Sequence, residues 1–283
     1  MNTYELDNIY CGECSAMMAK LPDDCIDLTA TSPPYDLVDY DNSGNLVTHP
    51  KNGLRTYNGY TWDFASVAHQ LYRVTKPGGV VVWVVGDATV NGSETGTSFR
   101  QALGFMEVGF KLHDTMIYHK INPAPQLKHQ QRYTQSFEYM FVFSKGMPIC
   151  NYISENTSTV RSSRQFYGTR DENGERAKSR YGYRQTSKIL QNVWSYNVGN
   201  SLYKNNDIES DHPAIFPEAL ARDHIISWSN PGDVVLDPFM GSGTTAKAAK
   251  QLGRHYLGFE ISQEYVNLAN KRLFQTNPPL FTL

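Results

Sequence analysis

The hydrophobic positions of this chain alternate between short apolar runs and longer stretches with a helical period. The run VVVWVV at residues 80–85 is continuous, which is typical of a strand buried on both faces of a sheet. The pattern predicts strands at residues 25–31, 80–85, 111–119, 139–143, 233–237 and 255–259. It predicts helices at residues 64–74, 99–108, 214–227, 244–252 and 263–273. Strands that alternate with helices indicate an α/β fold with a mainly parallel sheet.

The segment from residue 147 to residue 211 differs from the rest of the chain. It is rich in Arg, Ser, Tyr, Asn and Gly and has weak apolar periodicity. We therefore expect one domain made of residues 1–146 and 212–283, with residues 147–211 inserted into it.

Composition limits the class of protein. The chain has 283 residues, 40% hydrophobic and 19% charged, which is ordinary for a globular protein. It contains no run of about 18 apolar residues, so we expect no membrane span. The N-terminus has no signal-peptide pattern, which predicts a cytoplasmic location.

The four cysteines are expected to be reduced thiols. Cys11 and Cys14 form a C-x-x-C pair, but the second pair of ligands that a zinc site needs is missing. We expect no bound metal.

Positive charge is concentrated in the inserted segment. Residues 161–188 carry a net +5, although the whole chain carries −2, so the remainder carries about −7. A protein that binds nucleic acid need only be basic where it faces phosphates. A solvated surface loop is the alternative interpretation for any single arginine here.

A glycine-rich turn follows the predicted strand at residues 233–237. Ligands of parallel sheets bind at the carboxyl ends of strands, where glycine allows close approach of the backbone. The next strand ends at Glu260, which is suitably spaced to accept hydrogen bonds from ribose hydroxyls. The turn does not match the phosphate-binding P-loop, so it favours a cofactor without phosphates, such as S-adenosylmethionine; a purely structural corner is the alternative. Its residues are Asp237, Pro238, Phe239, Met240, Gly241, Ser242, Gly243 and Thr244.

A second polar motif follows the first predicted strand. Its residues are Ser32, Pro33, Pro34 and Tyr35. The prolines fix the backbone and remove two N–H donors, so carbonyl and hydroxyl acceptors remain for the exocyclic amine of a base. Tyr35 offers a flat face on which a base that has left the duplex could stack. A simple strand-terminating turn is the alternative.

Together these motifs resemble the DNA amino-methyltransferases, the N4-cytosine/N6-adenine family, in which a tetrad [SDN]-P-P-[YFW] accompanies a turn D-P-F-x-G-S-G-T. Both are complete here, and the tetrad precedes the turn, as in the β group of that family. Further matching features are Asp27, residues 76–79 with the strand after them, residues 122–125, and His212-Pro213.

The resemblance implies a methyltransferase fold, with a mostly parallel seven-stranded sheet and helices on both faces. It implies that Phe239, Gly241 and Gly243 line the S-adenosylmethionine site and that Glu260 holds the ribose. Glu13 stands where the family usually has aspartate near the cofactor's adenine, which is a departure from the family's pattern at this contact.

For the inserted segment the resemblance implies target recognition on double-stranded DNA. The expected contacts to phosphates and guanine are Arg161, Arg164, Arg170, Arg176, Lys178, Arg180, Arg184 and Lys188, with Tyr167, Tyr181 and Tyr183 between them. Residues 122–125 with Arg132 and Tyr133 border the base pocket in relatives, although a structural loop is the alternative.

The sequence leaves two candidates for the base that is modified. Within the family, serine at the first tetrad position tends to accompany N4-cytosine activity, which makes Ser32 the reason to prefer cytosine; N6-adenine is the alternative. A methyltransferase acting on RNA or on protein glutamine also stays open, as does a DNA-binding module without activity. The intact Ser32, Tyr35, Gly241 and Glu260 argue against the last of these. A homodimer and a place in a restriction system stay open.

Overall fold

The computed structural model describes residues 4–34, 39–40, 46–47, 62–90, 93–123, 132–156, 187–198 and 217–276. The chain divides into two compact units, one formed by Met1–Asn151 with Asn192–Leu283 and the other by Tyr152–Gln191. In the described part of the chain no helix is long and apolar enough to cross a membrane.

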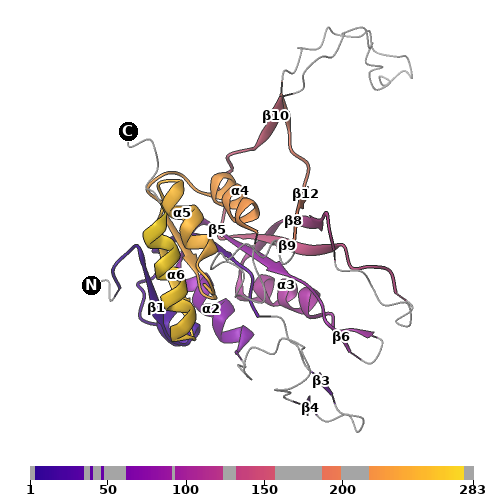
Figure 1. The fold of residues 1–283 in the computed structure, drawn as a ribbon, viewed down its shortest axis with the longest axis horizontal. Coiled ribbons are helices and arrows are strands. Elements are labelled where there is room, and N and C mark those ends of the chain that lie inside the picture. Colours follow the sequence, from indigo (N-terminus) through magenta and orange to yellow (C-terminus); the bar gives the residue numbers. More distant parts are fainter. Residues whose placement is uncertain are drawn as a thin grey trace. The chain divides into compact units, whose positions relative to one another are not determined.

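One large sheet organises the first unit (Figure 1). Among the described residues it has eight strands in the order β1-β14-β13-β2-β5-β9-β8-β12, and only β9 runs antiparallel to its neighbours. The strands are β1 (Asn8–Cys11), β2 (Ile26–Thr31), β5 (Thr75–Val85), β8 (Lys111–Lys120), β9 (Phe137–Ser144), β12 (Val193–Tyr196), β13 (Val234–Asp237) and β14 (His255–Glu260). The predicted mostly parallel sheet is therefore confirmed.

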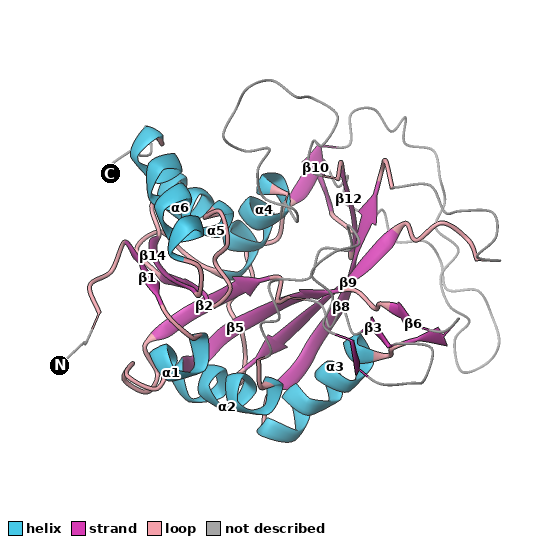
Figure 2. Ribbon diagram, turned by 60° about the horizontal axis from the view of Figure 1, so that its bottom comes forward, coloured by secondary structure: helices cyan, strands magenta, loops and turns pink. Residues whose placement is uncertain are grey.

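The helices form a layer on each face of this sheet. In Figure 2, α1, α2 and α3 cover one face, and α4, α5 and α6 cover the other. Their bounds are α1 (Cys14–Met18), α2 (Phe64–Val74), α3 (Thr97–Val108), α4 (Glu218–Trp228), α5 (Thr244–Gln251) and α6 (Gln263–Gln275). This is the arrangement that the resemblance implied.

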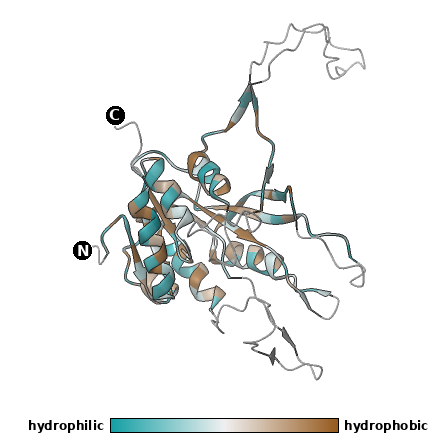
Figure 3. Cartoon of the chain, in the orientation of Figure 1, coloured by the Kyte–Doolittle hydropathy of each residue, from teal (hydrophilic) through white to brown (hydrophobic). Residues whose placement is uncertain are grey.

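The core follows from the continuous apolar strand in the middle of the sheet. Val80 to Val85 of β5 are all at most 1% exposed, and Trp83 packs against Phe105 of α3 with ring centroids 4.9 Å apart. Figure 3 shows the hydrophobic colour concentrated on the central strands. Burial on both faces explains why these positions do not alternate with polar residues.

Three two-stranded antiparallel sheets complete the described structure. They are β3 (Asp39–Tyr40) with β4 (Leu46–Val47), β6 (Thr89–Val90) with β7 (Ser93–Glu94), and β10 (Ser154–Asn156) with β11 (Ser187–Ile189). The last pair belongs to the second unit.

The structure contains short elements that the sequence analysis did not predict, including the six strands of the two-stranded sheets. The sheet has eight strands rather than seven, because β12 pairs in parallel with β8, at Val193 opposite Ile117. This strand lies in the polar segment that we assigned to the insertion, and its four residues are too few to reveal a period. Strand β1 and helix α1 were also not predicted, since each is only four or five residues long.

Candidate functional site

Two neighbouring parallel strands bring the tetrad and the glycine turn to one edge of the sheet. Strand β2, which precedes the tetrad, pairs with β13, which precedes the turn, at Leu28 opposite Val235. At their carboxyl ends the Thr31 hydroxyl donates a 2.6 Å hydrogen bond to Oδ1 of Asp237. Both strands end here, so a hydrogen bond joins the residue before the tetrad to the first residue of the glycine turn. These two residues are 206 positions apart in the chain.

A tryptophan links the two motifs a second time. The indole Nε1 of Trp62 donates to the carbonyl of Pro34 at 3.3 Å, and its ring lies 5.0 Å from that of Phe239, edge to face. Trp62 therefore contacts a tetrad backbone oxygen on one side and the glycine turn on the other. Ser32 and Pro34 are half-buried and Pro33 is buried, while the predicted stacking residue Tyr35 lies outside the described residues.

The turn itself, residues 237–244, is shaped by hydrogen bonds to two carboxylates. Asp237 Oδ1 also accepts from the backbone N–H of Phe239 at 3.0 Å. Glu260 Oε2 accepts from the N–H of Gly241 at 2.8 Å, and its Oε1 accepts from the N–H of Ser262 at 2.9 Å. Glu260, at the end of β14, is thus placed beside the turn as its spacing predicted.

Gly241 and Gly243 have backbone angles that favour glycine, with φ of 52° and 85°. A Cβ on Gly243 would lie 2.8 Å from Cβ of Ala269 in α6. The turn therefore needs glycine at residue 243 for two reasons, backbone conformation and close approach of a helix.

We expect Gly243→Ala to be strongly destabilising. A left-handed conformation costs a residue with a Cβ about 1–2 kcal/mol, and overpacking adds about 1–3 kcal/mol. Gly232→Ala is the matched control, because Gly232 has φ of 88° but a Cβ added there would meet nothing within 4 Å. Urea unfolding should give a larger loss for Gly243→Ala, partly restored by adding Ala269→Gly; equal losses would contradict the packing argument.

Asp237 is buried at the base of this site. Burial raises its pKa from 3.8 to about 6, against the opposing effect of the hydrogen bonds from Thr31 and the Phe239 N–H. Because the folded protein holds this proton more tightly than the unfolded chain, its contribution to stability falls as pH rises from about 4 to about 6.

Asp237→Asn should remove that dependence. We expect the stability advantage of wild type over the variant to shrink between about pH 4 and pH 6 and then to level off. Buried His224, whose pKa is lowered by burial to about 3, destabilises the fold in acid, but it does so in both proteins and cancels in the difference. Urea titrations at several pH values measure this; a constant difference would be the contrary result.

Glu260 retains capacity for a ligand. A carboxylate has about four lone-pair positions. Three backbone N–H groups act on it, those of Gly241, Ser262 and Ile261, which leaves room for a further donor. The side chain is half-buried, and burial raises its pKa, opposed by backbone N–H donors. These features fit a group that accepts hydrogen bonds from sugar hydroxyls.

Glu13 lies next to this site, and its side chain caps the N-terminus of helix α1. Its carboxylate caps α1, accepting from the N–H of Ser15 at 3.0 Å and of Ala16 at 2.7 Å. The N–H of the preceding Gly12 donates to the Glu260 carbonyl at 2.9 Å, which keeps the segment beside β14. A cofactor contact of Glu13 stays a prediction.

The residues expected to contact DNA are mostly not described. Lys188 is exposed on β11, while Arg161, Arg164, Arg170, Arg176, Lys178, Arg180 and Arg184 lie outside the described residues. Near the predicted border of the base pocket, the Asn122 side chain accepts from the N–H of Val198 at 2.8 Å, and Arg132 pairs with Glu94 at 3.3 Å. Tyr133 is fully exposed, and residues 124 and 125 are not described.

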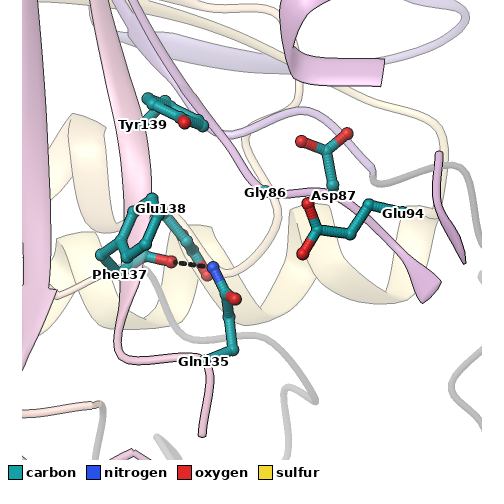
Figure 4. Close-up of a pocket in the computed structure, with 7 residues that line it drawn as sticks. All are labelled: Gly86, Asp87, Glu94, Gln135, Phe137, Glu138 and Tyr139. Carbon is teal, nitrogen blue, oxygen red and sulfur yellow. Dashed lines mark hydrogen bonds between the residues drawn. The ribbon is translucent and has the colours of Figure 1, made fainter. Parts of the chain in front are cut away.

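A pocket lies at the end of β5 and the start of β9 (Figure 4), at the same carboxyl edge of the sheet as the tetrad, because β5 pairs in parallel with β2 at Trp83 opposite Thr31. Its carboxylates already have partners: Asp87 accepts from the N–H of Ser98, Glu94 pairs with Arg132, and Glu138 pairs with Lys120 at 2.6 Å. The chemistry predicted from sequence does not involve this pocket, which is lined by Gly86, Asp87, Glu94, Gln135, Phe137, Glu138 and Tyr139.

Sequence reasoning did not identify several residues that shape the site. Thr31 is the residue immediately before the tetrad, so its neighbourhood could have suggested it. Trp62 and Arg272 gave no local signal, because they reach the motifs only through tertiary contacts.

Comparisons with known proteins identify related DNA methyltransferases. The model of a family described as DNA methylase, of the N6/N4 type, matches residues 26–271. The orphan methyltransferase M.BamHII of Bacillus amyloliquefaciens is 48% identical over 261 residues, covering 91% of this chain and 92% of its own. The type II methyltransferase M.MthZI of Methanothermobacter thermautotrophicus is 31% identical over 285 residues, covering 93% and 75%.

Solved structures share the fold. The PvuII DNA methyltransferase, described as cytosine-N4-specific, superposes with a TM-score of 0.65 at 21% identity, covering 97% of this chain and 87% of its own. The complex of M1.HpyAVI with S-adenosylmethionine gives a TM-score of 0.58 at 22% identity, covering 94% and 98%.

Proposed function

The chain belongs to the N6/N4 family of DNA methylases, and from that membership we propose that it transfers a methyl group from S-adenosylmethionine to the exocyclic amine of a base in double-stranded DNA. The observation that carries the proposal is the hydrogen bond between the side chains of Thr31 and Asp237. It supports one active site at the carboxyl edge of the sheet. There the methyl donor would lie over the glycine turn and the acceptor amine would lie at the tetrad.

The glycine turn and Glu260 are suited to hold the cofactor. Glu260 would accept hydrogen bonds from the ribose hydroxyls, and Phe239 would contact the cofactor beside Trp62. Gly241, Ser242, Gly243 and Thr244 would approach it with their backbone. S-adenosylmethionine supplies a methyl group on a positively charged sulfur, which needs no further activation.

The tetrad would orient the amine. A base amine is a weak nucleophile because its lone pair is conjugated with the ring, and hydrogen bonds from the amine to the Ser32 hydroxyl and the Pro33 carbonyl would favour a tetrahedral nitrogen. The Pro34 carbonyl already accepts from Trp62, and we assign this task to the Pro33 carbonyl. Holding the two reactants in this geometry can lower the activation free energy by up to about 7–11 kcal/mol.

The base must leave the duplex to reach this edge, which costs a few kcal/mol. We propose that Tyr35 stacks on the base once it is extruded, and that the segment 147–211 reads the sequence around it. Its arginines and lysines suit phosphates and guanine edges. Lys188 is the described member of this set and is exposed, as such a contact requires.

Among the two amines, we propose N4 of cytosine, because Ser32 opens the tetrad. N6 of adenine is the second candidate, since a serine hydroxyl can accept from either amine. Plasmid DNA methylated by the protein, digested to nucleosides and analysed by mass spectrometry, should contain N4-methyldeoxycytidine. N6-methyldeoxyadenosine in its place would reverse the assignment of the base but retain the reaction.

The substrate class needs a separate test. Labelled S-adenosylmethionine offered with DNA, RNA or a protein extract should deliver label to DNA. Transfer to RNA or to protein glutamine, with none to DNA, would exclude the proposed substrate.

A further inference from the structure

Helix α6 packs against the glycine turn, and a buried arginine of this helix makes the hydrogen bonds to the turn. Arg272 is only 8% exposed. Its Nη1 donates to the carbonyl of Ser242 at 2.7 Å and lies 2.8 Å from the Ser242 hydroxyl; the Thr244 hydroxyl is 3.4 Å away. An arginine thus lies beneath the turn that we assign to the cofactor.

The shape of the turn explains why an arginine is needed. The left-handed angles at Gly241 and Gly243 direct the Ser242 carbonyl towards α6, where it meets the guanidinium. A buried carbonyl must find a donor, and the guanidinium supplies one. Ala269, three residues earlier on the same face of α6, packs against Gly243, so α6 contacts two consecutive residues of the turn.

The turn opens directly into α5. Its N-cap residue is Gly243, which has no side chain that could accept from the first N–H groups of the helix. Free N–H groups and the positive end of the helix dipole favour an anionic group there. Glu260, an acceptor for hydroxyls, holds the turn from its other end through Gly241. A ligand with hydroxyls at one end and a carboxylate at the other would match this order.

We propose that Arg272 is a positioning residue of the cofactor site. It fixes Ser242 and Gly243 so that the first N–H groups of α5 face the carboxylate of the cofactor's amino-acid end, and its charge favours that carboxylate from below. The inference rests on the proposed use of S-adenosylmethionine. It predicts that Arg272 matters for the amino-acid end of the ligand and little for the adenosine end.

Two ligands distinguish the amino-acid end of the cofactor from its adenosine end. S-adenosylhomocysteine carries the amino-acid end, and 5′-methylthioadenosine shares its adenosine and thioether but lacks that end. Isothermal titration of the full chain with each ligand compares wild type, Arg272→Met, Arg272→Lys and the matched control Lys271→Met, which removes an exposed charge from the neighbouring position. Arg272→Met should raise the Kd of S-adenosylhomocysteine at least about tenfold and that of methylthioadenosine less than about threefold.

Arg272→Lys keeps the charge but loses the fork of donors, so it should fall between wild type and Arg272→Met. Lys271→Met should leave both affinities unchanged. Equal losses for the two ligands would mean that Arg272 only stabilises the fold, and no loss for either would also overturn the proposal. If Arg272→Met does not fold, the lysine variant gives the same comparison. Failure of wild type to bind S-adenosylhomocysteine would instead refute the proposed function itself, and this inference with it.

Discussion

Ser32→Ala should lower the rate of methyl transfer by about 100-fold, the scale of removing one hydrogen-bonding group from a reacting centre. The hydroxyl lies at the start of the tetrad, directly after Thr31, which is bonded to Asp237. Without it the base amine loses an acceptor that helps to set its geometry. The cofactor is held by the glycine turn and Glu260, so its Kd should change little.

The test combines two measurements on the same variant. Single-turnover methyl incorporation into DNA gives the rate, and titration with S-adenosylhomocysteine gives cofactor affinity. Ser227→Ala is the matched control: it removes a hydroxyl from a buried serine that donates to the Asp223 carbonyl of its own helix, away from both motifs. A Ser32→Ala protein with the wild-type rate would remove the tetrad from the mechanism.

Glu260→Gln should weaken cofactor binding by roughly 10- to 100-fold, since hydrogen bonds to charged groups contribute about 1.5–3 kcal/mol. Both carboxylate oxygens accept backbone N–H groups, from Gly241 and Ser262. An amide would present its NH₂ to one of these donors, so the variant distorts the turn as well as losing charge.

Glu264→Gln is the control for this experiment, because it makes the same substitution at an exposed glutamate in the first turn of α6. Binding of S-adenosylhomocysteine should be normal in the control and weak in Glu260→Gln, whose urea midpoint should also fall because one backbone N–H of the turn loses its acceptor. Unchanged affinity in Glu260→Gln would mean that the ribose is held elsewhere.

Much of the fold followed from periodicity. The helix at residues 64–74 and the strand run at residues 80–85 were predicted where α2 and β5 lie, because a long amphipathic period and a continuous β-branched run are strong local signals. Strand β12 was missed, since its four residues acquire meaning only when they pair with β8. The predicted start was least accurate at α4, which begins after Pro217 without a capping side chain.

The chemical motifs were also legible in the sequence. The tetrad, the glycine turn and Glu260 are each local patterns of residue type and spacing, so the chain alone indicated the kind of cofactor and the class of reaction. The contacts that join these motifs could not be predicted from the sequence. Thr31 with Asp237, Trp62 with Pro34, and Arg272 with Ser242 are pairs separated by 206, 28 and 30 positions.

The sequence by itself therefore predicted the long elements of the fold and pointed to the residues that we propose for the chemistry, because propensity, burial pattern and motif spacing act over a few neighbouring residues. Only the tertiary structure decided that β2 lies beside β13, which makes the two motifs one edge. Strand order is set by how all the apolar faces pack together at once, and no short window of sequence contains that information.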